Sequence, residues 1–190
     1  GTMQIHIAGQ ALTFRVPDWR SGPDWFSFWT HAWGLVFAIV GTILMLFKST
    51  SAVAFVSALI YGGCNSVLFF ASSLHHTVKR PASNEAQSLL RRFDHISIYL
   101  MIAGSYTPIC LVALEPKNGL PMLAVAWGLG LAGVAQKVFL EFSPRWATIG
   151  TYLVMGWCSI AMWNPLNRLF HTHDLFLLVF GGVLYSLGAV

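Results

Sequence analysis

The stretch AVAFVSALIYGGCNSVLFFASSL, residues Ala52–Leu74, runs without a charged side chain. A helix that crosses the hydrocarbon core of a bilayer needs about 20 mostly apolar residues, within a range of ~17–25, and this stretch meets that length. The composition of the whole chain agrees: 56% of the residues are hydrophobic and only 9% are charged, whereas a soluble domain carries about 25% charged residues. The sequence therefore predicts an integral membrane protein.

Five further apolar runs lie on either side of this stretch, and the last is cut off by the chain end. The predicted spans are Phe26–Phe47, Ala52–Leu74, Ile96–Leu114, Leu120–Phe139, Trp146–Trp163 and Leu175–Val190. We therefore expect an all-α fold, a polytopic transmembrane helix bundle with six spans visible. Residues 1–25 are mixed in polarity and are predicted to form an N-terminal cytoplasmic or interfacial tail, followed by a transmembrane domain over residues 26–190. Gln4–Val16 alternates like a strand, but we attach little weight to this pattern.

The distribution of basic residues predicts the orientation. Eight lie in segments on the side of the N-terminus: Arg15, Arg20, Lys79, Arg80, Arg91, Arg92, Lys137 and Arg145. Three lie on the opposite side: Lys48, Lys117 and Arg168. Because cytoplasmic loops carry the excess of Lys and Arg, we expect a cytoplasmic N-terminus. These residues are scattered in short loops and form no stripe of the kind that binds nucleic acid, so we expect no nucleic-acid partner.

Polar side chains gather at the predicted cytoplasmic ends of the second and third spans. Ser72 and His76 are four residues apart and share one helix face, and Asp94 begins the next helix at the same depth. Ionisable groups at such places are costly unless they are paired, hydrated or bound to metal. Imidazole nitrogen with a nearby carboxylate is the donor chemistry that zinc uses. A single histidine near a span end is nevertheless more often an interfacial hydrogen-bonding group than a ligand.

Other histidines and the cysteines give weaker signals. His31, His75 and His95 fall at the same membrane depth as His76, but the sequence does not say whether their side chains converge. His171 and His173 fall on the opposite face, where a solvated loop is the favoured interpretation over a surface metal site. Three cysteines each fall inside an apolar run and are expected to be inert packing residues: Cys64, Cys110 and Cys158.

The run Arg91–Pro108, RRFDHISIYLMIAGSYTP, resembles the third-helix signature of the hemolysin III family, which belongs with the progestin and adipoQ receptors and the adiponectin receptors. Ser72-x-x-x-His76 resembles the second-helix motif of that family, and Gly181–Ala189 its sixth helix. The similarity covers most of the chain, from about Trp25 to the end. It implies a seven-helix bundle with a cytoplasmic N-terminus, in the inner (plasma) membrane of a bacterium.

The same resemblance implies a zinc ion near the cytoplasmic side. Its ligands would be His76 and the two histidines of an H-x-x-x-H pair in a seventh helix. Asp94 would hold or activate a zinc-bound water, either as a ligand or through the water, and Ser72 would be a nearby polar contact. No H-x-x-x-H occurs in this chain, and we expect that the chain stops before the seventh helix. The alternatives are that the site has been lost, or that His31, His75 or His95 substitutes.

Three functions follow as hypotheses. The first is a zinc-dependent hydrolase of lipid-like amides or esters, with Asp94 accepting a proton and Ser72 close to the substrate; the amidase choice rests on the resemblance alone. The second is a cytolytic protein, and the third is a receptor or membrane-stress sensor with a structural metal. Membrane lipids are the expected partners in each case, and neither the substrate nor the oligomeric state follows from the sequence.

Overall fold

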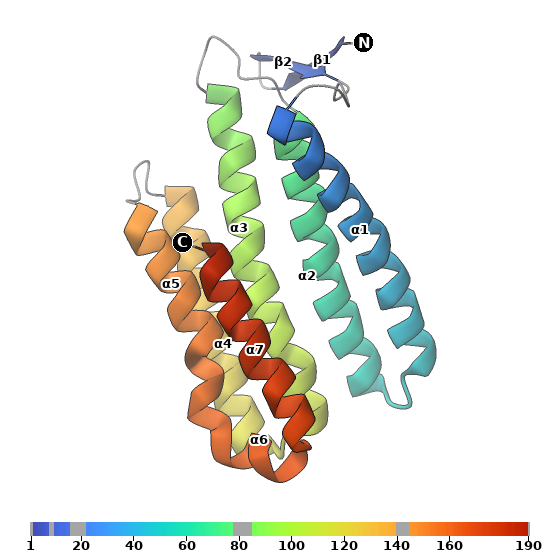
Figure 1. Cartoon of the computed structure of the whole chain (residues 1–190), viewed down its shortest axis with the longest axis vertical. Helices are drawn as coiled ribbons and strands as arrows, with labels where there is room; N and C mark the ends of the chain where they lie inside the picture. Colours follow the sequence, from blue (N-terminus) through green and yellow to red (C-terminus); the bar gives the residue numbers. More distant parts are fainter. Residues whose placement is uncertain (1, 8–9, 16–21, 78–84, 140–144, 190) are drawn as a thin grey trace.

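The structure, a computed structural model of the chain, describes residues 2–7, 10–15, 22–77, 85–139 and 145–189. Its long helices run up and down beside one another as a bundle (Figure 1). The α-helices are α1 (Gly22–Lys48), α2 (Ala52–Thr77), α3 (Glu85–Pro108), α4 (Pro116–Phe139), α5 (Arg145–Trp157), α6 (Trp163–Leu169) and α7 (Thr172–Ala189). A π-helical turn, Ile109–Ala113, extends α3, and a 3₁₀ turn, Cys158–Met162, joins α5 to α6.

Four helices of the described chain, α1 to α4, are long and apolar enough to cross a membrane, and α7 is a shorter apolar helix. The all-α bundle of membrane helices predicted from the sequence is therefore confirmed. α3 is the central helix. In its most apolar stretch of 18 residues, 44% of the residues are buried, whereas none are buried in the corresponding stretch of α1. α1 packs against α2 and leaves large apolar side chains such as Phe37 and Val40 exposed, which suits a helix that faces lipid.

The core lies between α3, α4, α5 and α7. Tyr99 of α3 is fully buried, and its ring centroid lies 4.5 Å from that of Tyr152 on α5. Two indole groups join neighbouring helices by hydrogen bonds. Trp127 Nε1 on α4 donates to Thr107 Oγ1 on α3, and Trp157 Nε1 on α5 donates to Ser186 Oγ on α7. Such polar contacts hold membrane helices in register, because lipid gives apolar faces little reason to associate.

The predicted span Trp146–Trp163 is not one continuous α-helix. α5 has 13 residues, about 20 Å at 1.5 Å per residue, and the 3₁₀ turn adds about 10 Å before α6 begins. Tyr106 of α3 gives the physical reason for the change in helix type. Its hydroxyl donates to the Met155 carbonyl and accepts from the Ser159 N–H. These two backbone groups would pair with each other in an uninterrupted α-helix.

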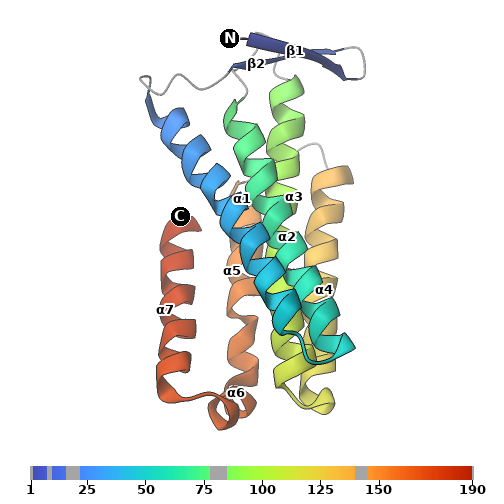
Figure 2. The same cartoon turned by 90° about the vertical axis from the view of Figure 1, so that its right-hand side faces the viewer.

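The N-terminal segment forms a small β-hairpin. Strands β1 (Thr2–Ile7) and β2 (Gln10–Arg15) pair antiparallel, with Thr2 opposite Arg15 and Ile7 opposite Gln10. The alternating pattern at Gln4–Val16 overlaps both strands, and the described part of the fold is all-α apart from this hairpin. The hairpin lies beside the bundle end at which α1 begins, α2 ends and α3 begins (Figures 1 and 2). The orientation of this end in the membrane stays a prediction.

Candidate functional site

Three imidazole rings gather where α1 begins and α2 ends. The His31 ring lies edge-on to the His76 ring, with centroids 5.3 Å apart and ring planes at 67°. The His75 ring centroid lies 5.4 Å from that of His76. The Nδ1 atoms of His31 and His75 are buried and have no hydrogen-bond partner among the described residues. Buried polar atoms are normally paired, so these two nitrogens remain free to accept or donate a hydrogen bond to a water or ligand.

A glycine brings α1 close enough for His31 to reach α2. A side chain at Gly34, one turn after His31, would overlap the Phe69 ring of α2. The same Phe69 ring lies edge-on to His31, with centroids 6.2 Å apart. The sequence could place His31 only at the correct depth. The packing of α1 on α2 then turns its ring toward His76.

Ser72 and Asp94 complete the predicted set at this end of the bundle. Ser72 lies one turn before His76 on α2 and is only 7% exposed. Asp94 lies near the start of α3 and is half-buried. Its carboxylate is within electrostatic range of both His31 and His95. The structure therefore gathers side chains of three consecutive helices, as Figure 2 shows for the ends of α1, α2 and α3.

Lys137 of α4 also lies at this end of the bundle, although its place in the sequence by itself indicates only topology. Its side chain is 8% exposed, and its Nζ donates to Thr148 Oγ1 of α5 at 2.6 Å. It lies within electrostatic range of His95 and Arg92. A sequence signal for it did exist, because Lys137 follows Gly130 and Gly133 at helical spacing and so continues the face of α4 that meets α3.

Among the described residues, the opposite end of the bundle holds no comparable group. His171 and His173 are exposed, and His173 Nδ1 lies 3.8 Å from the Asp174 carboxylate. Glu115 and Lys117 form an exposed ion pair at 2.7 Å, in which the Lys117 ammonium lowers the pKa of the Glu115 carboxyl. Exposed pairs of this kind add little stability. Both side chains are exposed as expected, but only His171 lies outside a helix, because His173 belongs to the first turn of α7.

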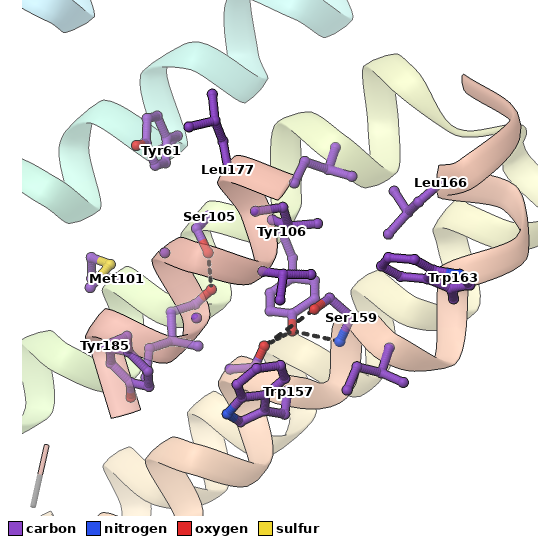
Figure 3. Close-up of a pocket in the computed structure, with 18 residues that line it drawn as sticks. Tyr61, Met101, Ser105, Tyr106, Trp157, Ser159, Trp163, Leu166, Leu177 and Tyr185 are labelled. Carbon is purple, nitrogen blue, oxygen red and sulfur yellow. Dashed lines mark hydrogen bonds between the residues drawn. The ribbon is translucent and has the colours of Figure 1, made fainter. Parts of the chain in front are cut away.

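A cavity of about 490 Å³ lies between α2, α3, α5 and α7, with mostly apolar and aromatic walls (Figure 3). Its walls include Tyr61, Tyr106 and Tyr185, and none of the histidines lines it. On α3 the lining begins at Met101 and reaches Ile109, roughly 10–22 Å along the helix axis from Asp94 at 1.5 Å per residue. The cavity and the polar end are therefore separate features of the bundle.

The zinc site implied by the resemblance is only partly represented in the described residues. The donor chemistry fits, because imidazole nitrogens and a carboxylate gather at His31, His75, His76 and Asp94. The arrangement does not supply a full set: nowhere in the described ranges do three His, Cys, Asp or Glu side chains come close enough to hold one ion. Zinc in an enzyme needs three protein ligands and an open position, so His76 and Asp94 would account for only part of such a site.

Long apolar helices with lipid-facing side chains and a polar cluster at one end define a polytopic helical membrane protein. The chain belongs to the haemolysin-III-related family, whose model matches residues 22–190. "Hemolysin-3" of Bacillus cereus is 35% identical over 166 residues, which cover 85% of this chain and 74% of that protein. The "Hemolysin-3 homolog" of Bacillus subtilis is 34% identical over 166 residues, which cover 85% of this chain and 76% of that protein.

A more distant similarity reaches animal proteins. The human "Monocyte to macrophage differentiation factor" is 29% identical over 165 residues, which cover 85% of this chain and 68% of that protein. No solved structure gives a significant match. The family and its membrane character are thus established by these similarities together with the helices of the bundle, whereas its chemistry has to be argued from the polar end.

Proposed function

We propose that this haemolysin-III-related protein is a zinc-dependent hydrolase of lipid-like amides or esters, with its site at the polar end formed by α1, α2 and α3. The observation that carries the proposal is the gathering of His31, His75 and His76 with the Asp94 carboxylate in range. Polar and ionisable groups are kept inside membrane bundles mainly where they serve a function. Water or a polar group of the substrate would satisfy the unpaired Nδ1 atoms of His31 and His75.

Each side chain has a role in this proposal. His76 offers an imidazole nitrogen to the metal, and two further ligands are needed, which the resemblance places in an H-x-x-x-H pair. Zinc supplies Lewis acidity, which polarises a carbonyl and makes water easier to deprotonate. Asp94 accepts the proton of the attacking water and passes it to the leaving group. Ser72, one turn below His76, orients the imidazole or the substrate by a hydrogen bond.

Zinc content per chain tests this proposal directly. The measurement uses detergent-purified protein as its gene encodes it, together with His76→Ala, Asp94→Ala and a control, His173→Ala, at the opposite end. We expect near-stoichiometric zinc in the wild type and in the control. The His76 variant should bind zinc at least ~10-fold more weakly, as losses around metal sites typically do. The Asp94 variant should keep more zinc than the His76 variant but lose hydrolysis of a fluorogenic lipid amide.

A wild-type protein that carries no zinc and takes up none on titration would remove the basis of the hydrolase. Cytolysis, which the name of the Bacillus cereus relative suggests, and membrane-stress sensing would then be the favoured functions. The packing gives cytolysis little support. Most side chains buried along α3, such as Ala103 and Tyr106, are apolar or aromatic, and Ser97 and Thr107 interrupt them, whereas a conducting pore needs a continuous polar lining.

We further propose that the protein resides in the inner (plasma) membrane of a bacterium, with its N-terminus in the cytoplasm. The support is the distribution of Lys and Arg, eight on one side and three on the other, because positive residues are retained on the cytoplasmic side. In this orientation the polar end faces the cytoplasm, and a lipid substrate would enter from the inner leaflet.

A further inference from the structure

The buried face of α4 ends in a charged residue. Six buried residues of this helix recur every three or four positions and so form one stripe: Gly119, Met122, Ala126, Gly130, Gly133 and Lys137. The first five are small or apolar, as expected where a helix packs against its neighbours. Lys137 occupies the last core position of the stripe, so its aliphatic stem and ammonium are held between helices instead of extending into water.

The ammonium of Lys137 has more donors than the described residues around it satisfy. It carries three N–H groups, and Thr148 Oγ1 accepts one of them at 2.6 Å. Among the described residues, the ionisable side chains whose charge acts on Lys137, or on which its charge acts, include Arg92 and His95, and neither is an acid. In the described part of the chain no carboxylate forms an ion pair with Lys137. A buried charge without a counter-charge is costly, so this position favours an anion.

The depth of Lys137 matches that of lipid phosphates. It lies two residues before the end of α4, and Thr148 lies in the first turn of α5. Phe139 and Trp146, on either side of the connection between these helices, are 80% and 77% exposed. Exposed aromatic side chains at span ends mark the level of the headgroups. The first turn of α5 adds the partial positive charge of a helix N-terminus, which also favours an anion.

We infer that Lys137, Thr148 and Arg92 form a binding site for the phosphate of an anionic phospholipid, between the end of α4 and the starts of α3 and α5. The Lys137 ammonium and the Arg92 guanidinium donate to phosphate oxygens, and Thr148 holds the lysine toward them. A phosphodiester keeps its charge throughout the physiological pH range, and it is abundant at this depth. The site uses neither His76 nor Asp94 and does not depend on the proposed hydrolase.

Lipid binding to purified protein tests this inference. The full chain is delipidated in a non-ionic detergent and titrated with dioleoylphosphatidylglycerol, with dioleoylglycerol, which has the same chains but no phosphate, and with inorganic phosphate. Native mass spectrometry counts the bound lipid, and tryptophan fluorescence follows thermal unfolding. The variants are Lys137→Met, Lys137→Arg and Arg92→Gln. The control is Arg168→Met, which removes a basic residue of α6 at the opposite end.

We expect one tightly held phosphatidylglycerol that raises the unfolding midpoint, and no effect of dioleoylglycerol. Lys137→Met and Arg92→Gln should each weaken its binding about tenfold, as the loss of a charged hydrogen bond does, while Lys137→Arg and Arg168→Met keep it. Unchanged binding in Lys137→Met would overturn the inference and leave Lys137 as an internal partner of Thr148 only. Displacement of the lipid by millimolar inorganic phosphate would overturn the assignment to a lipid. Should Lys137→Met fail to fold, Arg92→Gln decides in the same way.

Discussion

The Tyr106 hydroxyl of α3 takes the place of the backbone hydrogen bond that would otherwise join Ser159 N–H to the Met155 carbonyl where α5 ends. It donates to the Met155 carbonyl at 2.6 Å and to the Gly156 carbonyl at 3.1 Å, and it accepts from the Ser159 N–H at 3.0 Å. A single side chain of α3 thus satisfies the groups that α5 leaves free where its helix type changes. Unpaired backbone groups are especially costly inside a membrane protein, so these hydrogen bonds should stabilise the packing of α3 against α5.

Replacing Tyr106 by Phe should therefore destabilise the bundle. We expect a loss of about 1–3 kcal/mol, the cost of leaving buried polar groups unpaired, together with faster hydrogen exchange of the Ser159 amide. The matched control is Tyr185→Phe, because the Tyr185 hydroxyl is buried and has no hydrogen-bond partner in the described structure, so its removal should cost nothing. Thermal unfolding in detergent and exchange mass spectrometry give both readouts. Equal stability of the two variants would show that the Tyr106 hydrogen bonds are dispensable.

The candidate site was predictable in membrane depth but not in side-chain direction. Span ends placed His31, His76 and Asp94 at one level, since hydropathy fixes where a helix leaves the bilayer. Whether the rings meet depends on the rotation of each helix about its axis, and this rotation is fixed by contacts such as Gly34 against Phe69. Lys137 was missed as a site residue because a lysine at a span end also has a simpler explanation in topology.

At the scale of the element, α4 depends on glycine to approach α3. A Cβ at Gly133 would fall inside the van der Waals surface of the Tyr99 ring, whereas a Cβ at Gly128 would meet nothing within 4 Å. Tyr99 in turn packs against Tyr152 of α5, and Lys137 follows Gly133 by one turn. The close approach at Gly133 therefore holds three helices together just below the proposed phosphate site.

Gly133→Ala should push α4 away from α3 and cost about 1–3 kcal/mol, as overpacking does. Gly128→Ala makes the same chemical change on the exposed face of the same helix. It should leave stability unchanged or raise it slightly, because alanine favours the helix more than glycine does. Comparing the unfolding midpoints of the two variants in one detergent separates packing from helix propensity. A stable Gly133 variant beside an unchanged Gly128 variant would argue against tight α3–α4 contact.

Element by element, the sequence predicted what depends on hydropathy and missed what depends on contacts between distant residues. Long apolar runs identified α1 to α4 because length and composition alone define such spans. The run Trp146–Trp163 also met that rule, yet its helix changes type at Cys158 because Tyr106 takes the Ser159 N–H. The strand pattern at Gln4–Val16 is a weak signal when taken alone, because the hairpin depends on the pairing of β1 with β2.

At the scale of the whole molecule, the bundle exposes large apolar side chains on its surface as well as burying them in its core. Many of its large apolar side chains are exposed on the outer faces of α1, α2 and α7, among them Phe37, Phe70 and Phe180. Its polar groups collect at the helix ends and between helices. Because the apolar exterior can face lipid in either orientation, the difference in the number of basic residues between the two ends determines which end faces the cytoplasm.

Orientation can be tested by labelling single cysteines in intact cells with a membrane-impermeant maleimide. The background replaces Cys64, Cys110 and Cys158 by alanine, and one exposed basic residue is then changed at each end, Lys117→Cys or Arg91→Cys. If the N-terminus is cytoplasmic, Lys117→Cys should label in intact cells and Arg91→Cys only after permeabilisation. Both should label equally in detergent, which checks that each thiol is accessible. The reverse pattern would place the polar end and the proposed phosphate site on the outer face, where a substrate would have to come from the outer leaflet.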